Sequence, residues 1–284
     1  MSTQNTISLS LTPKQRAKLK ETFNDSLSSI TPPYAEYQLK VENCTITSYQ
    51  SGKVVFQGSD AEIYASPFQT TTLNTYPQAG SDEVGTGDYF GPVVVCASIV
   101  TAKQVDTLNA SGIRDSKALK DQDILKVAPQ LLSSIPHSLL IVSPKKYNEV
   151  HQSENLNAIK ALLHNQAYLN LQKKQKLPSF CVIDQFTPKS SYYRYLKGQP
   201  KIVQDLHFET KAEDKYLAVA VSSVLARYAF LKEMEKMEAK WNMVFHKGGG
   251  ALADQSAKEF VETHGRKALE EVAKIHFKNT QKIE

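Results

Sequence analysis

Residues 80–88 read Gly-Ser-Asp-Glu-Val-Gly-Thr-Gly-Asp, and residues 91–101 read GPVVVCASIVT. This pattern predicts a short strand over 79–84, a glycine-rich turn over 85–88 and a long apolar strand over 91–101. A continuously apolar strand is normally covered on both faces. We also expect strands at 139–142 and 180–183 and long helices at 115–132, 154–173 and 212–237. Strands that alternate with helices in this way predict an α/β fold with a mixed, layered sheet.

Two adjacent carboxylates, Asp82 and Glu83, stand at the end of the short strand. Adjacent residues of a strand point to opposite faces, so both serve one metal site only where the strand ends or twists. Gly85 and Gly87 permit such a bend, and they also let a sugar-phosphate backbone approach closely. An exposed acidic hairpin turn explains the same short pattern.

Two more acidic residues stand at the ends of expected elements. Asp184 follows the apolar strand 180–183, where a carboxylate is costly unless it pairs with a cation or binds a metal. A helix cap or a turn residue is the alternative explanation. Glu213 stands at the start of the apolar helix, where acidic residues are favoured on electrostatic grounds alone, and its neighbour Asp214 competes for any role. Carboxylates suit Mg²⁺, and two such ions about 4 Å apart catalyse in-line phosphodiester displacement. We therefore interpret Asp82, Glu83, Asp184 and Glu213 as a candidate two-metal site.

Composition and charge narrow the class of protein. With 41% hydrophobic residues the chain can bury a core, and we expect neither a membrane span nor a signal peptide. Three widely spaced cysteines make a disulfide framework or a zinc site improbable and favour the cytoplasm. The net charge of +5 lies outside residues 1–70, where six basic and six acidic residues cancel. This excess agrees with an acidic partner, but a solvated basic surface explains it equally well.

The N-terminal part reads as a separate small unit over residues 1–65. Thr12 and Pro13 predict a helix start, with the helix running to about residue 28. Residues 44–49 and 54–58 predict a hairpin of two strands, whereas 34–41 is either helical or extended. The polar stretch 66–77 is the candidate linker to a larger unit over 78–284.

Several motifs resemble those of the type 2 ribonucleases H. They are DEVGTGDYFGPVVVCA from residue 82, Arg114-Asp115-Ser116-Lys117, the apolar strand before Asp184, and Lys211-Ala212-Glu213 before VAVSSVLAR. The chain resembles ribonuclease HIII more than HII in three respects. The turn has Thr86 where HII has arginine, the fourth carboxylate is Glu213 where HII has aspartate, and YQSGKVVFQG at 49–58 resembles a TATA-binding-protein-like substrate-binding domain.

This resemblance implies an RNase H fold, with a mixed five-stranded sheet and flanking helices. It implies Mg²⁺- or Mn²⁺-dependent cleavage of the RNA strand of an RNA–DNA hybrid, leaving 3′-hydroxyl and 5′-phosphate ends. Asp82, Glu83, Asp184 and Glu213 become the ligands of two metal ions by motif match, with Asp82 bridging both. A monomer is expected, because a duplex substrate does not require a dimer.

Substrate contacts are expected beside the carboxylates. The backbone of Gly85, Thr86 and Gly87 stands next to the metal pair, where contacts to 2′-hydroxyl groups distinguish RNA from DNA. Ser116 and Lys117 hold a phosphate in this interpretation, or else form a helix cap with a solvated lysine. Arg227 contacts a phosphate or pairs with a carboxylate, and the sequence does not decide.

Three other functions are weighed against this interpretation. An HII-like nuclease that cuts at single ribonucleotides is disfavoured by Thr86, and a non-catalytic hybrid-binding protein is disfavoured by the intact set of four carboxylates. A small-molecule enzyme lacks support, because no phosphate-cradling loop, G-x-S-x-G or H-E-x-x-H motif occurs.

Overall fold

The computed structural model describes residues 5–65, 68, 75–113 and 119–283. The chain divides into two compact units, Met1–Asn74 and Thr75–Glu284, and each is described by itself. This division falls inside the expected linker 66–77. Most of that stretch lies outside the described residues, so the linker itself stays a prediction.

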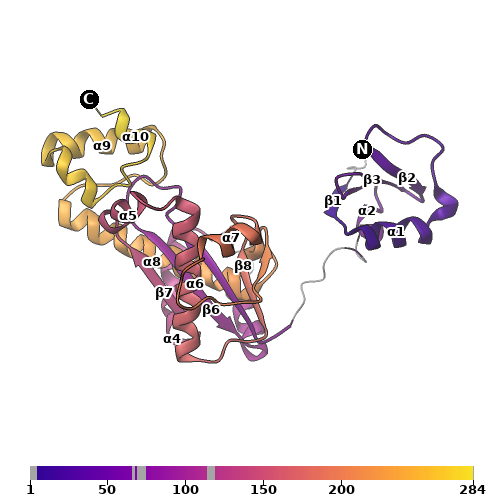
Figure 1. The fold of residues 1–284 in the computed structure, drawn as a ribbon, viewed down its shortest axis with the longest axis horizontal. Helices are drawn as coiled ribbons and strands as arrows, with labels where there is room; N and C mark the ends of the chain where they lie inside the picture. The colour runs from indigo at the N-terminus through magenta and orange to yellow at the C-terminus, as the bar shows by residue number, and fades with distance from the viewer. Residues whose placement is uncertain (1–4, 66–67, 69–74, 114–118, 284) are drawn as a thin grey trace. The chain divides into compact units, whose positions relative to one another are not determined.

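The described part of the N-terminal unit forms an antiparallel sheet in the order β1-β4-β3-β2 (Figure 1). Alternate strand residues, such as Val54 and Phe56, are fully buried against residues of two helices, such as Leu19 and Ala61. The elements are β1 (Thr6–Ser10), α1 (Pro13–Thr22), the 3₁₀ turn η1 (Asn24–Ser26), β2 (Ala35–Val41), β3 (Cys44–Tyr49), β4 (Lys53–Gln57) and α2 (Ala61–Ala65). The hairpin and the helix start at Pro13 are confirmed, whereas the helix ends about six residues earlier than expected.

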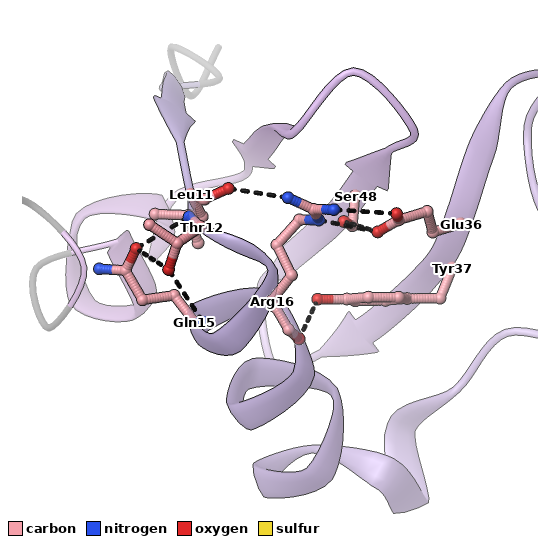
Figure 2. Close-up of polar contacts among 7 residues, drawn as sticks. All are labelled: Leu11, Thr12, Gln15, Arg16, Glu36, Tyr37 and Ser48. Atoms are coloured by element: carbon pink, nitrogen blue, oxygen red, sulfur yellow. Dashed lines mark hydrogen bonds and ion pairs between the residues drawn. The ribbon is translucent and has the colours of Figure 1, made fainter.

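A polar cluster joins α1 to the sheet in this unit (Figure 2). Arg16 donates hydrogen bonds from Nε and Nη2 to the two carboxylate oxygens of Glu36, at 2.8 and 3.0 Å, and from Nη1 to the carbonyl of Leu11. The Tyr37 hydroxyl donates to the carbonyl of Arg16, and Ser48 donates to Glu36. Arg16 therefore stabilises the unit and is not a free cation for nucleic acid.

The larger unit contains the expected five-stranded mixed sheet, in the order β7-β6-β5-β8-β9 (Figure 1). Strand β5 (Gln78–Val84) pairs antiparallel with β6 (Val93–Val100) and parallel with β8 (Phe180–Asp184). Strand β7 (His137–Val142) is antiparallel to β6, and the short β9 (His207–Glu209) is parallel to β8. All eight residues of β6 are buried, as its apolar sequence predicts.

Helices cover both faces of this sheet. Residues of α8 (Leu217–Trp241) and α4 (Asp121–Ser134) pack with one face, and residues of α6 (Leu156–Lys174) and α7 (Lys189–Tyr195) pack with the other. The remaining helical elements are η2 (Ala102–Gln104), α3 (Val105–Ala110), α5 (Pro144–His151), η4 (Ala212–Asp214), α9 (Ala251–His264), η5 (Arg266–Glu271) and α10 (Lys278–Gln281).

The packing of α8 on β5 fixes the position of the strand that carries Asp82. A side chain at Gly80 would clash with the backbone of Ala218 and Val219, so glycine is needed for this close approach. The Ser222 hydroxyl donates to the Gly80 carbonyl at 2.8 Å. The expected single helix over 212–237 is wrong in one respect. Lys211 has φ 54°, and a separate 3₁₀ turn, η4, precedes α8.

Candidate active site

Asp82 and Asp184 lie at the carboxyl ends of neighbouring parallel strands. The register pairs Ser81 with Ile183, so each aspartate is the next residue along its strand. Asp82 is 8% exposed. Burial raises the pKa of Asp82 well above its usual value, and the negative charges of Glu83 and Asp184 raise it further, against a hydrogen bond from Ser223. Asp82 is therefore buried beside two further carboxylates, and Asp184 is half-buried at the end of the neighbouring strand.

Glu83 points to the opposite face of the sheet from Asp82. Strand β5 stays paired with β6 as far as Val84, so the regular alternation of side chains continues through both carboxylates. On the α6 side, Glu83 Oε1 forms an ion pair with the Lys160 ammonium, and His164 Nε2 lies 2.8 Å from Glu83 Oε2. The strand therefore does not bend at Asp82 and Glu83 in this structure, and a metal site shared by both carboxylates stays a prediction.

The surroundings of Glu83 keep its carboxylate charged. Burial alone raises the pKa of Glu83, but the hydrogen bond from His164 and the charges of His164 and Lys160 together lower it below its usual value. His164 Nδ1 lies 2.8 Å from the Ser81 hydroxyl, which completes a Ser81–His164–Glu83 chain. Ser81 and His164 are both fully buried. This chain therefore cannot deliver a serine nucleophile to a substrate, and its role is to orient Glu83.

The fourth expected carboxylate, Glu213, lies in η4 directly after Ala212. The Ala212 backbone N–H donates to Asp184 Oδ1 at 2.9 Å, which ties η4 to the end of β8. Glu213 is buried, whereas its competitor Asp214 is exposed. The structure therefore favours Glu213 over Asp214 for any role inside the site.

Oxygen donors of this kind suit a hard divalent cation. Asp82 combines burial with two neighbouring carboxylates, and a cation would offset this charge. Among the described residues, however, no group of three or more His, Cys, Asp or Glu side chains already converges as a metal site. The orientation of Glu83 toward Lys160 is consistent with this finding. The carboxylates of Asp82, Glu83, Asp184 and Glu213 fit a divalent cation once the Glu83 side chain turns away from α6.

The glycine-rich turn follows Glu83 and Val84. Gly85 has φ +94°, and a Cβ there would clash with the Pro92 carbonyl, so this glycine is required by the fold itself. Gly87 is exposed, and a Cβ there would meet open space. Thr86 lies between them and is half-buried. Gly87 and Thr86 are thus the accessible part of the predicted substrate contact.

Ser116, Lys117 and Arg227 are the other residues for which a phosphate contact was considered. Ser116 and Lys117 lie outside the described residues, so their predicted phosphate contact is not described by the structure. Arg227 pairs with a carboxylate: its Nε and Nη2 donate to the two oxygens of Asp121 at 2.9 and 3.1 Å, and Lys247 also contacts Asp121. This ion pair joins α8 to the start of α4.

Lys160 and His164 were not among the predicted site residues. Both are buried on α6, and they are four residues apart, so they project from the same face of the helix. The sequence did contain a signal for them: a lysine and a histidine four residues apart on a mostly apolar helix face. A buried lysine needs a partner, so this pattern predicts a buried polar or acidic group nearby. Without the fold, that partner was not identifiable as Glu83.

Comparison with known proteins agrees with the fold and this site. A family model described as Ribonuclease HII matches residues 79–280, and another, described as a domain of unknown function (DUF3378), matches residues 6–80. The larger unit is therefore a ribonuclease H of the HII class in its fold and sequence. The ribonuclease HIII of Bacillus pumilus (strain SAFR-032) is 40% identical over 96% of this chain and 97% of its own length. The chain belongs to the ribonuclease HIII family.

Solved structures of ribonucleases HIII match nearly the whole chain. Bst-RNase HIII in complex with Mn²⁺ is similar with a TM-score of 0.73 and 34% identity, over 98% of each chain. Aquifex aeolicus RNase H3 is similar with a TM-score of 0.58 and 25% identity, over 95% of this chain and 99% of that one. The likeness of the N-terminal unit to the TATA-binding protein stays a prediction.

Proposed function

We propose that this protein is an endoribonuclease that hydrolyses the RNA strand of RNA–DNA hybrids and leaves 3′-hydroxyl and 5′-phosphate ends. Membership of the ribonuclease HIII family supports the reaction class. The observation that carries the proposal for this chain is the buried carboxylate of Asp82 next to the half-buried carboxylate of Asp184, near the ends of the paired strands β5 and β8.

Asp82, Glu83, Asp184 and Glu213 are the proposed metal ligands, and Asp82 is the proposed bridge between two ions. Its position between Glu83 on its own strand and Asp184 on the next supports this role. Divalent cations, Mg²⁺ or Mn²⁺, would activate the attacking water and stabilise the leaving 3′ oxygen. The Mn²⁺ complex of Bst-RNase HIII supports the choice of cation.

Recognition of the RNA strand is assigned to the turn after β5. The open space at Gly87 supports close approach of a sugar-phosphate backbone to Gly85, Thr86 and Gly87, where contacts to 2′-hydroxyl groups exclude DNA. Ser116 and Lys117 are proposed to hold a phosphate. The N-terminal unit is proposed to bind the hybrid as a substrate-binding domain.

The protein is proposed to act as a cytoplasmic monomer. Its three cysteines, all among the described residues, are free thiols, which supports a reducing compartment. Across the described part of the chain, no helix combines the length and the apolar character that crossing a bilayer requires.

The test is cleavage of a duplex whose RNA strand is labelled at its 5′ end, incubated with the full chain and Mg²⁺, Mn²⁺ or EDTA. We expect internal cuts in the RNA strand with either cation, none with EDTA, and no cutting of a DNA–DNA duplex. Binding without cleavage in all three conditions would instead identify a non-catalytic hybrid-binding protein.

A further inference from the structure

Glu83 differs from Asp82 in having both carboxylate oxygens occupied by basic side chains of one helix. Oε1 contacts the Lys160 ammonium and Oε2 lies 2.8 Å from His164 Nε2, and both residues belong to α6. Asp82 lies on the other face of β5 and shares neither contact. One carboxylate of the site is thus paired with basic side chains, whereas Asp82 has no ion pair with the residues that the structure describes.

The Lys160 ammonium is held tightly in this place. Lys160 is 8% exposed and His164 is fully buried. The ring of Phe186 covers both: its centroid lies 4.1 Å from Lys160 Nζ and 5.3 Å from the His164 ring, with which it stacks. Phe186 follows Asp184 by two residues, so the cover comes from the segment directly after the strand that supplies the neighbouring carboxylate. An ammonium between a carboxylate and an aromatic face is a favourable arrangement.

A divalent cation and this ammonium need the same carboxylate. An ion pair with Lys160 uses the oxygen that a metal ion would take, and the described carboxylates do not converge as a metal site while Glu83 points to α6. Since like charges near one buried carboxylate repel each other, the fixed charge of Lys160 opposes the metal ion.

We propose that Lys160 and His164 are positioning residues that act through Glu83: Lys160 competes with the divalent cation for this carboxylate, and His164 fixes its orientation. This inference rests on the proposed function, in which Glu83 is a metal ligand. Metal binding then includes the exchange of the Lys160–Glu83 ion pair, and Lys160 lowers the affinity of the site for its cation.

The test measures Mn²⁺ binding to the full chain by isothermal titration calorimetry, which does not depend on turnover. Lys160→Met removes the charge and keeps the length of the side chain. We expect it to lower the Mn²⁺ dissociation constant about tenfold, since a fixed positive charge beside the site is lost. Lys160→Arg keeps the charge and should bind Mn²⁺ as the wild type does. Lys173→Met, at an exposed position on the same helix, is the matched control and should have no effect.

A double-mutant cycle separates action through Glu83 from a general effect of charge. In a Glu83→Gln background, most of the gain from Lys160→Met should disappear, because the carboxylate for which the two cations compete is gone. If Lys160→Met does not fold, as judged by its thermal unfolding in EDTA, Lys160→Gln removes the same charge with a polar side chain and replaces it in the cycle.

The outcomes distinguish this inference from the proposed function. If the wild type binds no Mn²⁺, the proposed metal site fails and the inference falls with it. If the wild type binds Mn²⁺ and Lys160→Met binds it equally or more weakly, the competition proposed for Lys160 is overturned while the metal site stands. A gain of equal size in the wild-type and Glu83→Gln backgrounds overturns the claim that Lys160 acts through Glu83.

Discussion

Replacing Asp82 by asparagine should stabilise the metal-free protein while abolishing its activity. Neighbouring strands lie about 4.8 Å apart, so charges on Asp82 and Asp184 separated by about 5–6 Å repel by roughly 3 kcal/mol at an effective dielectric constant near 20. Structural relaxation reduces the recoverable part to about 1–2 kcal/mol. Asparagine keeps an oxygen that accepts the hydrogen bond Asp82 now receives from the Glu83 N–H at 2.7 Å. The expected gain is therefore electrostatic.

Thermal unfolding of the wild type and Asp82→Asn in EDTA at neutral pH measures this gain. For a unit of about 200 residues, 1–2 kcal/mol corresponds to a rise of about 2–8 °C in Tm. Cleavage of the hybrid should fall about 10³-fold, the loss that about 4 kcal/mol of transition-state stabilisation implies. Asp123→Asn, which changes an exposed aspartate of α4, should change Tm little and serves as the control. A lower Tm for Asp82→Asn, or near-normal cleavage, would refute the electrostatic reasoning.

The gain in stability of Asp82→Asn over the wild type should increase as pH rises. Burial and the neighbouring carboxylates raise the pKa of Asp82 in the folded, metal-free protein above the unfolded value of about 3.9. The folded state then binds more protons than the unfolded state, so this group destabilises the protein progressively as pH rises from about 4 through its folded pKa. Asp82→Asn does not lose stability in this way as pH rises. The difference in Tm between Asp82→Asn and the wild type should therefore vanish at pH below about 4.

The remaining predictions concern the turn and the fourth carboxylate. This chain has Thr86 where ribonucleases HII have arginine, so we expect it to cut a duplex with one ribonucleotide much more slowly than a duplex with several. Equal cleavage rates on the two substrates would refute this prediction. Glu213→Gln should lower kcat about 10²-fold or more, whereas Asp214→Asn should not, and the reverse order would reassign the fourth ligand. Gly85→Ala should lower the free energy of unfolding by more than the roughly 1–3 kcal/mol of its left-handed backbone, because a Cβ there would also clash with the Pro92 carbonyl. Gly87→Ala should instead leave Tm unchanged and raise KM for the hybrid, and a change in Tm alone would argue against a substrate contact.

The parts of the fold that follow from apolar patterns were predictable from sequence. The buried strand β6 is continuously apolar, and Asp184 ends an apolar strand in both the sequence and the structure. The pairing of β5 with β8 was not predicted, because periodicity does not specify which strands are neighbours. Strand β1 was missed because it has no fully buried residue, so its side chains carry little apolar signal.

The local geometry of the site was less predictable. The break between η4 and α8 lies at Tyr216, whose backbone is extended (φ −122°, ψ 116°), and no glycine or proline marks it in the sequence. Residues 34–41 were undecided, and they form β2 after Tyr34, which has φ 64°. The contacts of Glu83 with α6 join residues about 80 positions apart, and the sequence pattern contains no information on such a pairing.

The most direct test of the metal site is anomalous diffraction from crystals of the full chain soaked in Mn²⁺. The account predicts anomalous density in contact with the carboxylates of both Asp82 and Asp184, with Glu83 turned from Lys160 toward it. Manganese bound only elsewhere on the protein, with Asp82 and Asp184 free of it under conditions that support cleavage, would contradict the account.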